Sequence, residues 1–127
     1  MKKIFIASSR KFYDQVKTLK SKFDELGVIG FYPYFEFNGE SVEKDEELKK
    51  ELTLKHFPEI DQVDVFYILA RDGYAGISVS IEASYAYAKG KEIISSEQLQ
   101  ELALRAIVNR IKTPDEFISY IANKSSW

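Results

Sequence analysis

The alternation of short apolar runs with segments of helical spacing is the feature that most constrains the fold of this chain. Ile4–Ala7 is entirely apolar, and Val63–Leu69 is apolar except for a single aspartate. Runs of this kind are typical of strands that are buried on both faces. Each is followed by a segment whose apolar residues recur every three or four positions, which is the period of a helix. The pattern predicts strand–helix–strand units and therefore a parallel sheet.

Four strands and five helices follow from the same pattern. The expected strands are Ile4–Ala7, Val28–Phe37, Val63–Leu69 and Glu92–Ile94. The expected helices are Phe12–Leu26, Glu43–His56 (ended or restarted by Pro58), Ser78–Lys89, Leu99–Ile111 and one that begins at Thr113-Pro114-Asp115-Glu116, a helix start with a capping box. A loop is expected at Asn38-Gly39, and a loose tail from Lys124 to Trp127. The prediction is a single α/β domain over residues 1–127: three α/β/α layers, with a small parallel, flavodoxin- or Rossmann-like sheet of four to five strands and helices on both faces.

Composition excludes several classes of function. The 18 Lys and Arg residues against 20 Asp and Glu give a net charge of −2, so the bulk balance gives no support for a nucleic-acid partner. The absence of cysteine excludes disulfides, zinc–thiolate sites and a cysteine nucleophile, and one histidine cannot form a multi-histidine metal site. We therefore expect no metal and no cofactor.

No segment predicts membrane insertion or export. The apolar run Ile4–Ala7 is far shorter than the core of a signal peptide. No stretch approaches the roughly 18 apolar residues that cross a bilayer. We expect a cytoplasmic protein that has no membrane partner.

Two loops are candidates for a ligand site, because ligands of open parallel sheets bind beyond the carboxyl ends of the strands, where strand order reverses. Ser8, Ser9 and Arg10 follow the first strand, and Arg71–Ser78 follows the central one. Two hydroxyls and a guanidinium at a helix start suit a phosphate or a carboxylate. An equally simple interpretation is that a serine only caps the helix and that Arg10 is solvated. The spacing matches neither a P-loop nor a dinucleotide-binding motif.

The second loop is the more specific of the two. Gly73 and Gly76 flank Tyr74 and allow the backbone to approach a ligand closely, while Ser78 can cap the following helix. Glu82 lies one helical turn after Ser78 on the same face, among mostly apolar neighbours. A carboxylate in such surroundings needs a partner. The alternative is that Glu82 only interacts favourably with the helix dipole.

Three other features have simple structural interpretations. Asp64, at the start of the central strand, is best interpreted as a turn residue. His56, the single histidine, is more often a partner of a helix C-terminus than a catalyst when it lies near a helix end. The aromatic segment Phe31–Phe37 is mostly expected in the core and on the sheet, although one or two of its rings can stack on a base.

Taken together, these residues resemble the nucleoside 2-deoxyribosyltransferase-like family, including its 2′-deoxynucleoside 5′-monophosphate N-hydrolase branch. The likeness runs from Lys3 to about Glu97. It rests on Ile4–Arg10, Asp64, Gly73–Ala86 and Gly90-Lys91. The Glu-x-x-Tyr-Ala…Gly-Lys element that begins at Glu82 is its most distinctive part.

The resemblance implies a role for each matching position. Glu82 matches the nucleophilic glutamate of the family, and Ser8 and Arg10 match positions that bind the 5′-phosphate. Ser78 or Ser80 takes the part of a serine that also contacts the phosphate. The implied reaction is attack of the carboxylate at C1′, which expels the base and leaves a glycosyl-enzyme intermediate. The substrate is then a nucleoside or nucleotide, and the protein a homodimer or higher homo-oligomer.

The sequence departs from the family at one position. Counting back from Asp64 to the place where the family carries a catalytic aspartate leads to His56. The acid that assists the leaving base is then His56, another residue, or absent. Because the aspartate is missing, a catalytically inactive nucleotide-binding module of the same fold stays open. The aromatic segment leaves open a third hypothesis, a scaffold that recruits another protein through Phe31–Phe37.

Overall fold

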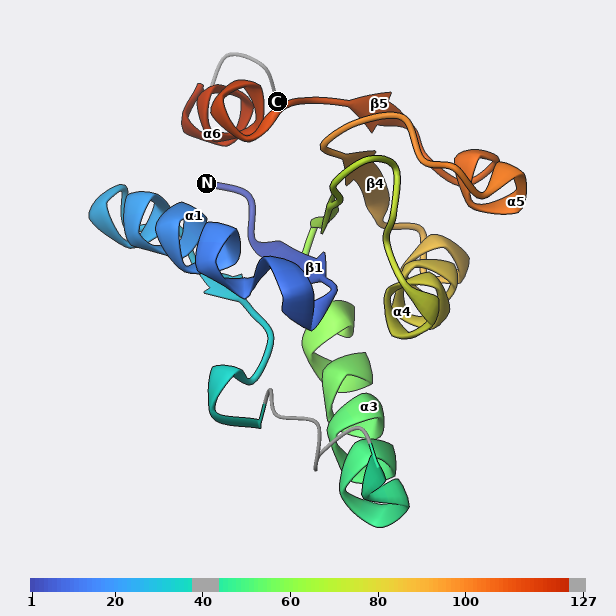
Figure 1. The fold of residues 1–127 in the computed structure, drawn as a ribbon. Coiled ribbons are helices and arrows are strands. Elements are labelled where there is room, and N and C mark those ends of the chain that lie inside the picture. Colours follow the sequence, from blue (N-terminus) through green and yellow to red (C-terminus); the bar gives the residue numbers. More distant parts are fainter. Residues whose placement is uncertain (38–43, 124–127) are drawn as a thin grey trace.

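The computed structural model describes residues 1–37 and 44–123, and forms a five-stranded, fully parallel sheet flanked by helices (Figure 1). The strands are β1 (Ile4–Ser8), β2 (Gly30–Phe31), β3 (Val65–Leu69), β4 (Glu92–Ser95) and β5 (Arg110–Ile111). The helices are α1 (Tyr13–Glu25), α3 (Glu46–Asp61), α4 (Ile77–Ala88), α5 (Leu102–Arg105) and α6 (Pro114–Ala122), with 3₁₀ turns η1 (Arg10–Phe12) and η2 (Phe35–Phe37). The loop expected at Asn38-Gly39 and the tail expected from Lys124 to Trp127 lie outside the described residues.

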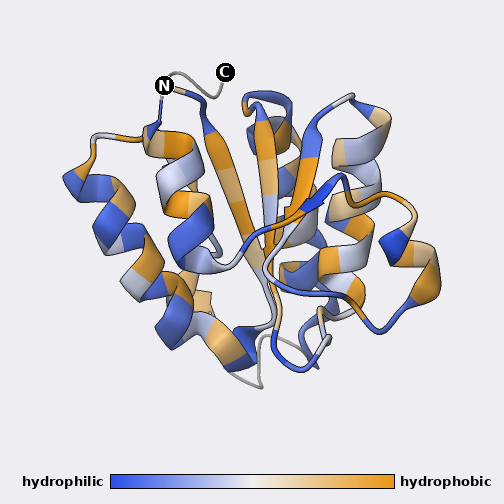
Figure 2. Cartoon of the chain, turned by 90° about the horizontal axis from the view of Figure 1, so that it is seen from above, coloured by the Kyte–Doolittle hydropathy of each residue, from blue (hydrophilic) through white to orange (hydrophobic). Residues whose placement is uncertain are grey.

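Two hydrophobic cores sandwich the sheet, which confirms the three-layer α/β/α prediction. Neighbouring residues of one strand contribute to opposite cores, because side chains alternate across a strand. Phe5 and Phe66 belong to the core under α3 and α4, and their rings stack with centroids 5.3 Å apart. Ile4 and Tyr67 belong to the core under α1 and α6. In Figure 2 the hydrophobic strands lie between helices whose outer surfaces are mostly hydrophilic.

The order of the strands is β2-β1-β3-β4-β5, so the chain reverses its direction of travel across the sheet between β1 and β3. These two strands pair in parallel over five residues each, from Ile4 opposite Val65 to Ser8 opposite Leu69. Consequently the loops that follow β1 and β3 diverge to opposite faces of the sheet. A crevice between such loops is the usual ligand site of this topology.

The start of α6 has the capping box that the sequence predicts. Thr113 Oγ1 accepts a hydrogen bond from the Glu116 backbone N–H, and Glu116 Oε1 accepts one from the Thr113 N–H at 2.8 Å. Pro114 occupies the first turn, where a missing N–H costs nothing. The hydrogen bonds from Thr113, above all that from its backbone, lower the pKa of Glu116. The capping box therefore stabilises the fold at neutral pH. This stabilisation is lost as the pH falls through the lowered pKa of Glu116.

The strand predicted over Val28–Phe37 is wrong for most of its length. Only Gly30 and Phe31 pair with β1, and the chain then leaves the sheet through Pro33. The aromatic rings of this segment find partners on helices instead. The Phe35 ring, for example, packs edge-on against Tyr13 of α1, with centroids 5.5 Å apart.

Pro58 neither ends nor restarts the helix predicted over Glu43–His56, contrary to prediction. Helix α3 continues through it to Asp61. Proline removes one backbone donor from a helix, but the turn that contains it is fixed by tertiary contacts. Ile60 is fully buried, and the Phe57 ring stacks on Tyr85 of α4 with centroids 4.5 Å apart.

The long helix predicted over Leu99–Ile111 is also wrong, because the segment divides into the single turn α5 and the edge strand β5. Asn109 causes the change. Its backbone N–H donates to the Ile93 carbonyl at 2.8 Å, and its side-chain oxygen accepts from the Ile93 N–H at 2.7 Å. These bonds to β4 hold the chain extended where a helix would continue.

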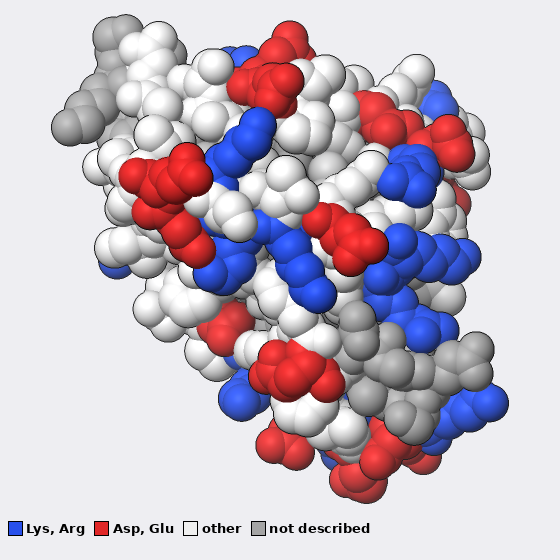
Figure 3. Space-filling view, turned by 60° about the vertical axis from the view of Figure 1, so that its left-hand side comes forward, with Lys and Arg blue, Asp and Glu red and all other residues white. Residues whose placement is uncertain are grey.

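None of the described helices is long and apolar enough to cross a membrane. On the face shown in Figure 3, acidic and basic side chains are interspersed. A cytoplasmic location stays a prediction.

Phe117 offers a direct test of the core under α6. Its side chain is fully buried and its ring stacks on Tyr67, with centroids 4.0 Å apart. We expect Phe117→Ala to lower the free energy of unfolding by about 3–5 kcal/mol, because it leaves a large cavity. Urea denaturation measures this loss. The control Leu102→Ala, at a position 71% exposed, should change the free energy by no more than about 0.5 kcal/mol. An equal loss in both variants would contradict the packing described.

Candidate functional site

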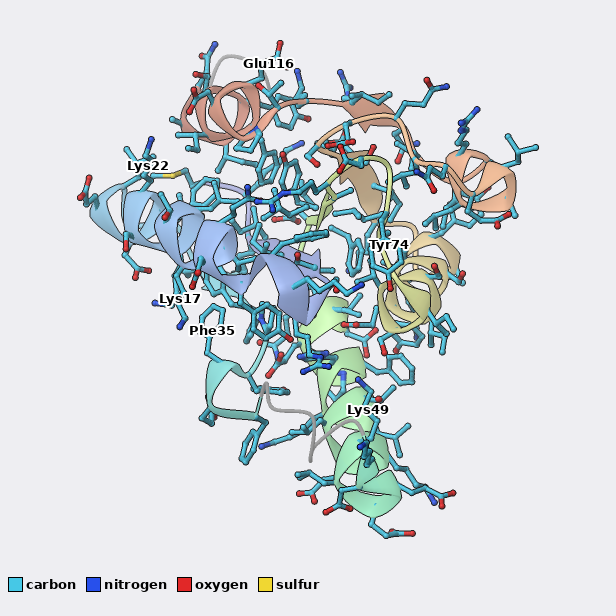
Figure 4. The ribbon with its side chains drawn as sticks, in the orientation of Figure 1. Lys17, Lys22, Phe35, Lys49, Tyr74 and Glu116 are labelled. Carbon is cyan, nitrogen blue, oxygen red and sulfur yellow. The ribbon has the colours of Figure 1, made fainter. Side chains whose placement is uncertain are left out.

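A cavity of about 430 Å³ lies beyond the carboxyl ends of β1 and β3, where the strand order reverses. Residues 5–8 of β1 line one side of it. One wall comes from α3 and the segment after β2, and the other from the loop 74–76 and the first turns of α4. Figure 4 labels Lys49 on α3 and Tyr74 before α4, which line these two walls.

Most of the side chains singled out in the sequence line this one cavity. They are Ser8, Ser9, Arg10, His56, Tyr74, Gly76, Ser78 and Glu82. Gly73 and Ser80 do not line it. The Gly73 N–H donates to Glu97 Oε2 at 2.7 Å on the side facing β4, and the Ser80 hydroxyl donates to the Gly76 carbonyl at 2.9 Å within α4.

The loop after β1 presents hydroxyls and a guanidinium to the cavity. Ser8 is buried at the end of the strand, and its hydroxyl donates to the Ser9 carbonyl at 3.2 Å. Ser9 caps η1, its Oγ accepting a hydrogen bond from the Lys11 N–H. Arg10 is the first residue of η1 and lines the cavity. The capping role of Ser9 and the position of Arg10 at the cavity are therefore found together.

The first turn of α4 forms the opposite side. Gly76, not Ser78, precedes the helix as its N-cap, with φ 101° and ψ 159°. Residues other than glycine scarcely adopt this conformation. Ser78 therefore lies inside the first turn, whose backbone N–H groups have no carbonyl partner within the helix. Residues 76–79 of this helix start line the cavity. Tyr74 stands beside them, with the Lys11 ammonium 4.9 Å from its ring centroid.

Glu82 and His56 meet at the inner end of the cavity. The Nδ1 atom of His56 on α3 lies 2.8 Å from Oε2 of Glu82 on α4. Only 13% of the His56 side chain and 9% of the Glu82 side chain are exposed. The two atoms are at ion-pair distance without the alignment of a hydrogen bond, and within the described residues neither Glu82 Oε2 nor His56 Nε2 has a hydrogen-bond partner. His56 lies inside α3 rather than at its end, so it is no partner of a helix C-terminus.

Aromatic rings enclose His56. Tyr34 stacks on the imidazole, with centroids 4.6 Å apart and planes 20° apart, and Phe5 of β1 contacts it edge-on at 5.1 Å. The Tyr34 hydroxyl donates to Glu59 Oε2 at 2.7 Å. Burial, followed by this hydrogen bond to Glu59, raises the pKa of Tyr34 well above its ordinary value. The phenol therefore stays protonated and keeps its bond to the carboxylate.

Sequence reasoning missed the α3 wall. Lys49, Leu52 and Thr53 line the cavity together with His56. Their spacing of three, four and seven residues from Lys49 is that of one helix face, and this signal could have found them. Only a helix is predicted over this segment from the sequence.

Asp64 lies away from the cavity, at the amino end of β3. Its Oδ2 accepts a hydrogen bond from the Lys3 N–H at 2.9 Å, as suits a turn residue. Within residues 1–37 and 44–123, no three His, Asp or Glu side chains are grouped so as to hold a metal ion.

Comparison with known proteins gives the fold a context. No protein-family model and no curated protein matches this sequence. Among solved structures, the chain is similar to a 2-deoxyribosyltransferase from Bacillus psychrosaccharolyticus, with a TM-score of 0.73 and 17% identity over 98% of this chain and 94% of that one. It is also similar to a CMP N-glycosidase from Clostridium botulinum (TM-score 0.57, 16% identity, 94% and 98% covered). A third similar structure is that of a conserved protein from Enterococcus faecalis, with a TM-score of 0.66 and 16% identity over 95% of this chain and 97% of that one.

At such identities these matches establish the fold. The chain has the α/β fold of a 2-deoxyribosyltransferase and of an N-glycosidase, along almost the whole length of each. The resemblance inferred from the sequence is thus confirmed at the level of architecture.

Proposed function

We propose that this protein cleaves or transfers the N-glycosidic bond of a nucleoside, a deoxynucleoside or a 5′-monophosphate of either, with Glu82 as nucleophile. The observation that carries the proposal is that Glu82 and Arg10, from elements distant in sequence, line the same cavity at the reversal of strand order. The two enzymes that share its fold act on this class of compound according to their names.

The chemistry needs one carboxylate beside C1′ of the sugar. An oxygen of Glu82 attacks C1′, the C1′–N bond breaks, and its electron pair leaves with the base, which takes up a proton. The glycosyl-enzyme ester is then attacked at C1′ by water, which regenerates Glu82 and releases the sugar. A nitrogen of a second base in place of water gives transfer. Only 9% of the Glu82 side chain is exposed, so the carboxylate is largely removed from bulk solvent.

The entrance of the cavity suits an anionic group on the substrate. Arg10 supplies a guanidinium, and Ser9 and Ser78 supply hydroxyls beside the first turn of α4. Free N–H groups at a helix start and a nearby guanidinium are a common arrangement for a phosphate. We therefore place a 5′-phosphate here and the sugar between this end and Glu82.

We place the base of the substrate against the wall formed by the segment after β2. Pro33, Tyr34 and Phe37 line the cavity from the segment after β2, and aromatic and apolar faces favour a planar base. Of the residues named from the sequence, Gly73 and Ser80 stay outside this assignment, because neither lines the cavity.

One observation favours a second candidate, a nucleotide-binding module without turnover. Among the described residues that line the cavity, Glu82 is the only carboxylate, and glycosidases ordinarily use two. His56, which holds the place of the family aspartate, is then the candidate acid. Binding without release of base is the outcome that would favour the module.

Self-association is also part of the proposal. The outward face of α4 carries Ile77, Ile81, Ser84 and Ala88, all exposed and uncharged, with Ile77 83% and Ile81 48% accessible. Their spacing of four, three and four residues forms one continuous stripe along the helix. A second copy of the chain packed on this stripe would bury it and stand directly beside the cavity.

Activity is tested with a panel of nucleosides, deoxynucleosides and their 5′-monophosphates, with release of free base followed by chromatography. We expect Glu82→Gln to abolish release from every substrate that the wild type cleaves, because an amide cannot form the ester intermediate. Its melting temperature should stay close to that of the wild type. Glu47→Gln, on the exposed start of α3, is the matched control and should keep full activity. A wild type that releases no base from any member of the panel would refute the enzymatic proposal.

Phosphate recognition is tested with Arg10→Ala. Loss of the guanidinium should weaken the binding of 5′-monophosphates at least about tenfold, since hydrogen bonds to charged groups contribute about 1.5–3 kcal/mol each. The unphosphorylated nucleosides should bind almost as before. Calorimetric titration of both ligand classes measures the difference. Lys89→Ala, which removes a positive charge at the far end of α4, should affect neither class; an equal loss for both classes in Arg10→Ala would contradict the assignment.

The oligomeric state is measured by analytical ultracentrifugation. We expect the wild type to form dimers or larger assemblies, and Ile81→Lys to shift the protein to monomers, since a lysine at the centre of the stripe would have to be desolvated. Leu102→Lys, an exposed apolar position on α5, is the control that should leave the assembly intact. A wild type that is monomeric at all concentrations would rule the interface out.

A further inference from the structure

Among the described residues, the close polar contact of Glu82 Oε2 is with His56. The Oε2 atom lies 2.8 Å from His56 Nδ1 and is shielded from solvent. Two lone pairs at that distance repel each other, so a proton must lie on one of the two atoms. Only the form with the proton on Nδ1 leaves Glu82 ionised, as a nucleophile must be.

The plane of the imidazole is fixed by its aromatic neighbours, because Tyr34 covers one of its faces and Phe5 meets it edge-on. Within that plane, the contact with Glu82 selects the side on which Nδ1 lies. The opposite ring nitrogen, Nε2, is buried without a hydrogen-bond partner in the described part of the chain. No polar contact there competes with the one to Glu82.

Tyr34 is itself fixed to the helix that carries His56. Its hydroxyl donates to Glu59, which lies three residues after His56 on α3. Residues three apart are neighbours on a helix surface. Tyr34 therefore spans from Glu59 to the imidazole face and clamps the ring against α3.

From this geometry we propose that His56 is a positioning residue for the nucleophile, and that Tyr34 and Glu59 form a clamp that holds His56 in place. The inference rests on the proposed function for the role of Glu82, and it gives His56 a task at the nucleophile instead of at the leaving base. In this arrangement a protonated Nδ1 attracts the nearer oxygen of the carboxylate at ion-pair distance and leaves the other oxygen to attack C1′.

The position of the proton is tested without any substrate. Because the sequence has a single histidine, the two ¹⁵N signals of a labelled imidazole are unambiguous, and their shifts report which ring nitrogen carries the proton. At a pH where the ring is neutral, we expect Nδ1 to be protonated in the wild type. Glu82→Leu should move the proton toward Nε2, while Glu47→Gln should leave the spectrum unchanged. A wild-type imidazole protonated mainly on Nε2 would overturn the proposal.

Kinetics test the positioning itself. His56→Leu should lower kcat about 100-fold with little change in KM, because a misplaced nucleophile affects the reaction more than the binding. His56→Asn places an amide N–H near the position of Nδ1 and should recover most of kcat. An Asn variant as impaired as the Leu variant would refute a role through Nδ1.

The clamp is tested with two variants of one residue. Tyr34→Phe keeps the ring stack and loses the bond to Glu59, whereas Tyr34→Leu loses both. We expect kcat to fall in that order, with the ¹⁵N spectrum of Tyr34→Leu showing a mixture of both protonated forms. If neither variant changes kcat or the spectrum, the clamp has no role.

These readouts separate the two levels of the proposal. A wild type without base release refutes the proposed function, while the ¹⁵N spectra still decide whether His56 holds Glu82. An active wild type whose His56→Leu variant keeps its kcat refutes the positioning role alone.

Discussion

The pairing of β1 with β3 is the constraint on which both the fold and the site depend. It joins the two strands that are buried on both faces, and it places the reversal of strand order between them. The loops after these strands must then diverge to opposite faces of the sheet, which leaves a crevice between them. The catalytic chemistry that we propose uses this crevice, so the feature that builds the core also creates the cavity.

The site combines groups that no short segment of the chain could bring together. β1 leads to the guanidinium of Arg10, α4 carries the carboxylate of Glu82, and α3 contributes the imidazole of His56. A buried carboxylate is costly unless a nearby partner offsets its desolvation. The imidazole is such a partner, and only small fractions of both side chains are exposed. Packing and chemistry are thus coupled at Glu82.

Prediction from the sequence succeeds where local pattern decides and fails where a distant partner does. β1, β3 and α6 follow from continuous apolar runs and from a capping box, both of which are visible within a few residues. The segment after β2 leaves the sheet because its rings pack on α1 and on His56, and Asn109 ends a helical pattern because it bonds Ile93. These contacts join residues that are distant in sequence, so the local preferences of each segment do not reveal them.

The same distinction applies to the candidate site. The two loops and Glu82 could be named from strand ends and spacing, because topology alone brings them to one edge of the sheet. The contact between His56 and Glu82 could not, since it depends on how α3 and α4 pack side by side. The clamp of Tyr34 and Glu59 depends in turn on a backbone path that leaves the predicted strand.

Helix α3 is anchored unevenly. Ile60, near its end, is its one buried residue among those described, whereas the turns that carry Lys49 have no fully buried side chain. Hydrophobic burial therefore anchors the helix one turn from His56, while the side chains beside Lys49 stay partly exposed. A substitution near Lys49 should consequently cost the fold less than one near Ile60, so the lining of the cavity can vary in sequence at one end of α3 more easily than at the other.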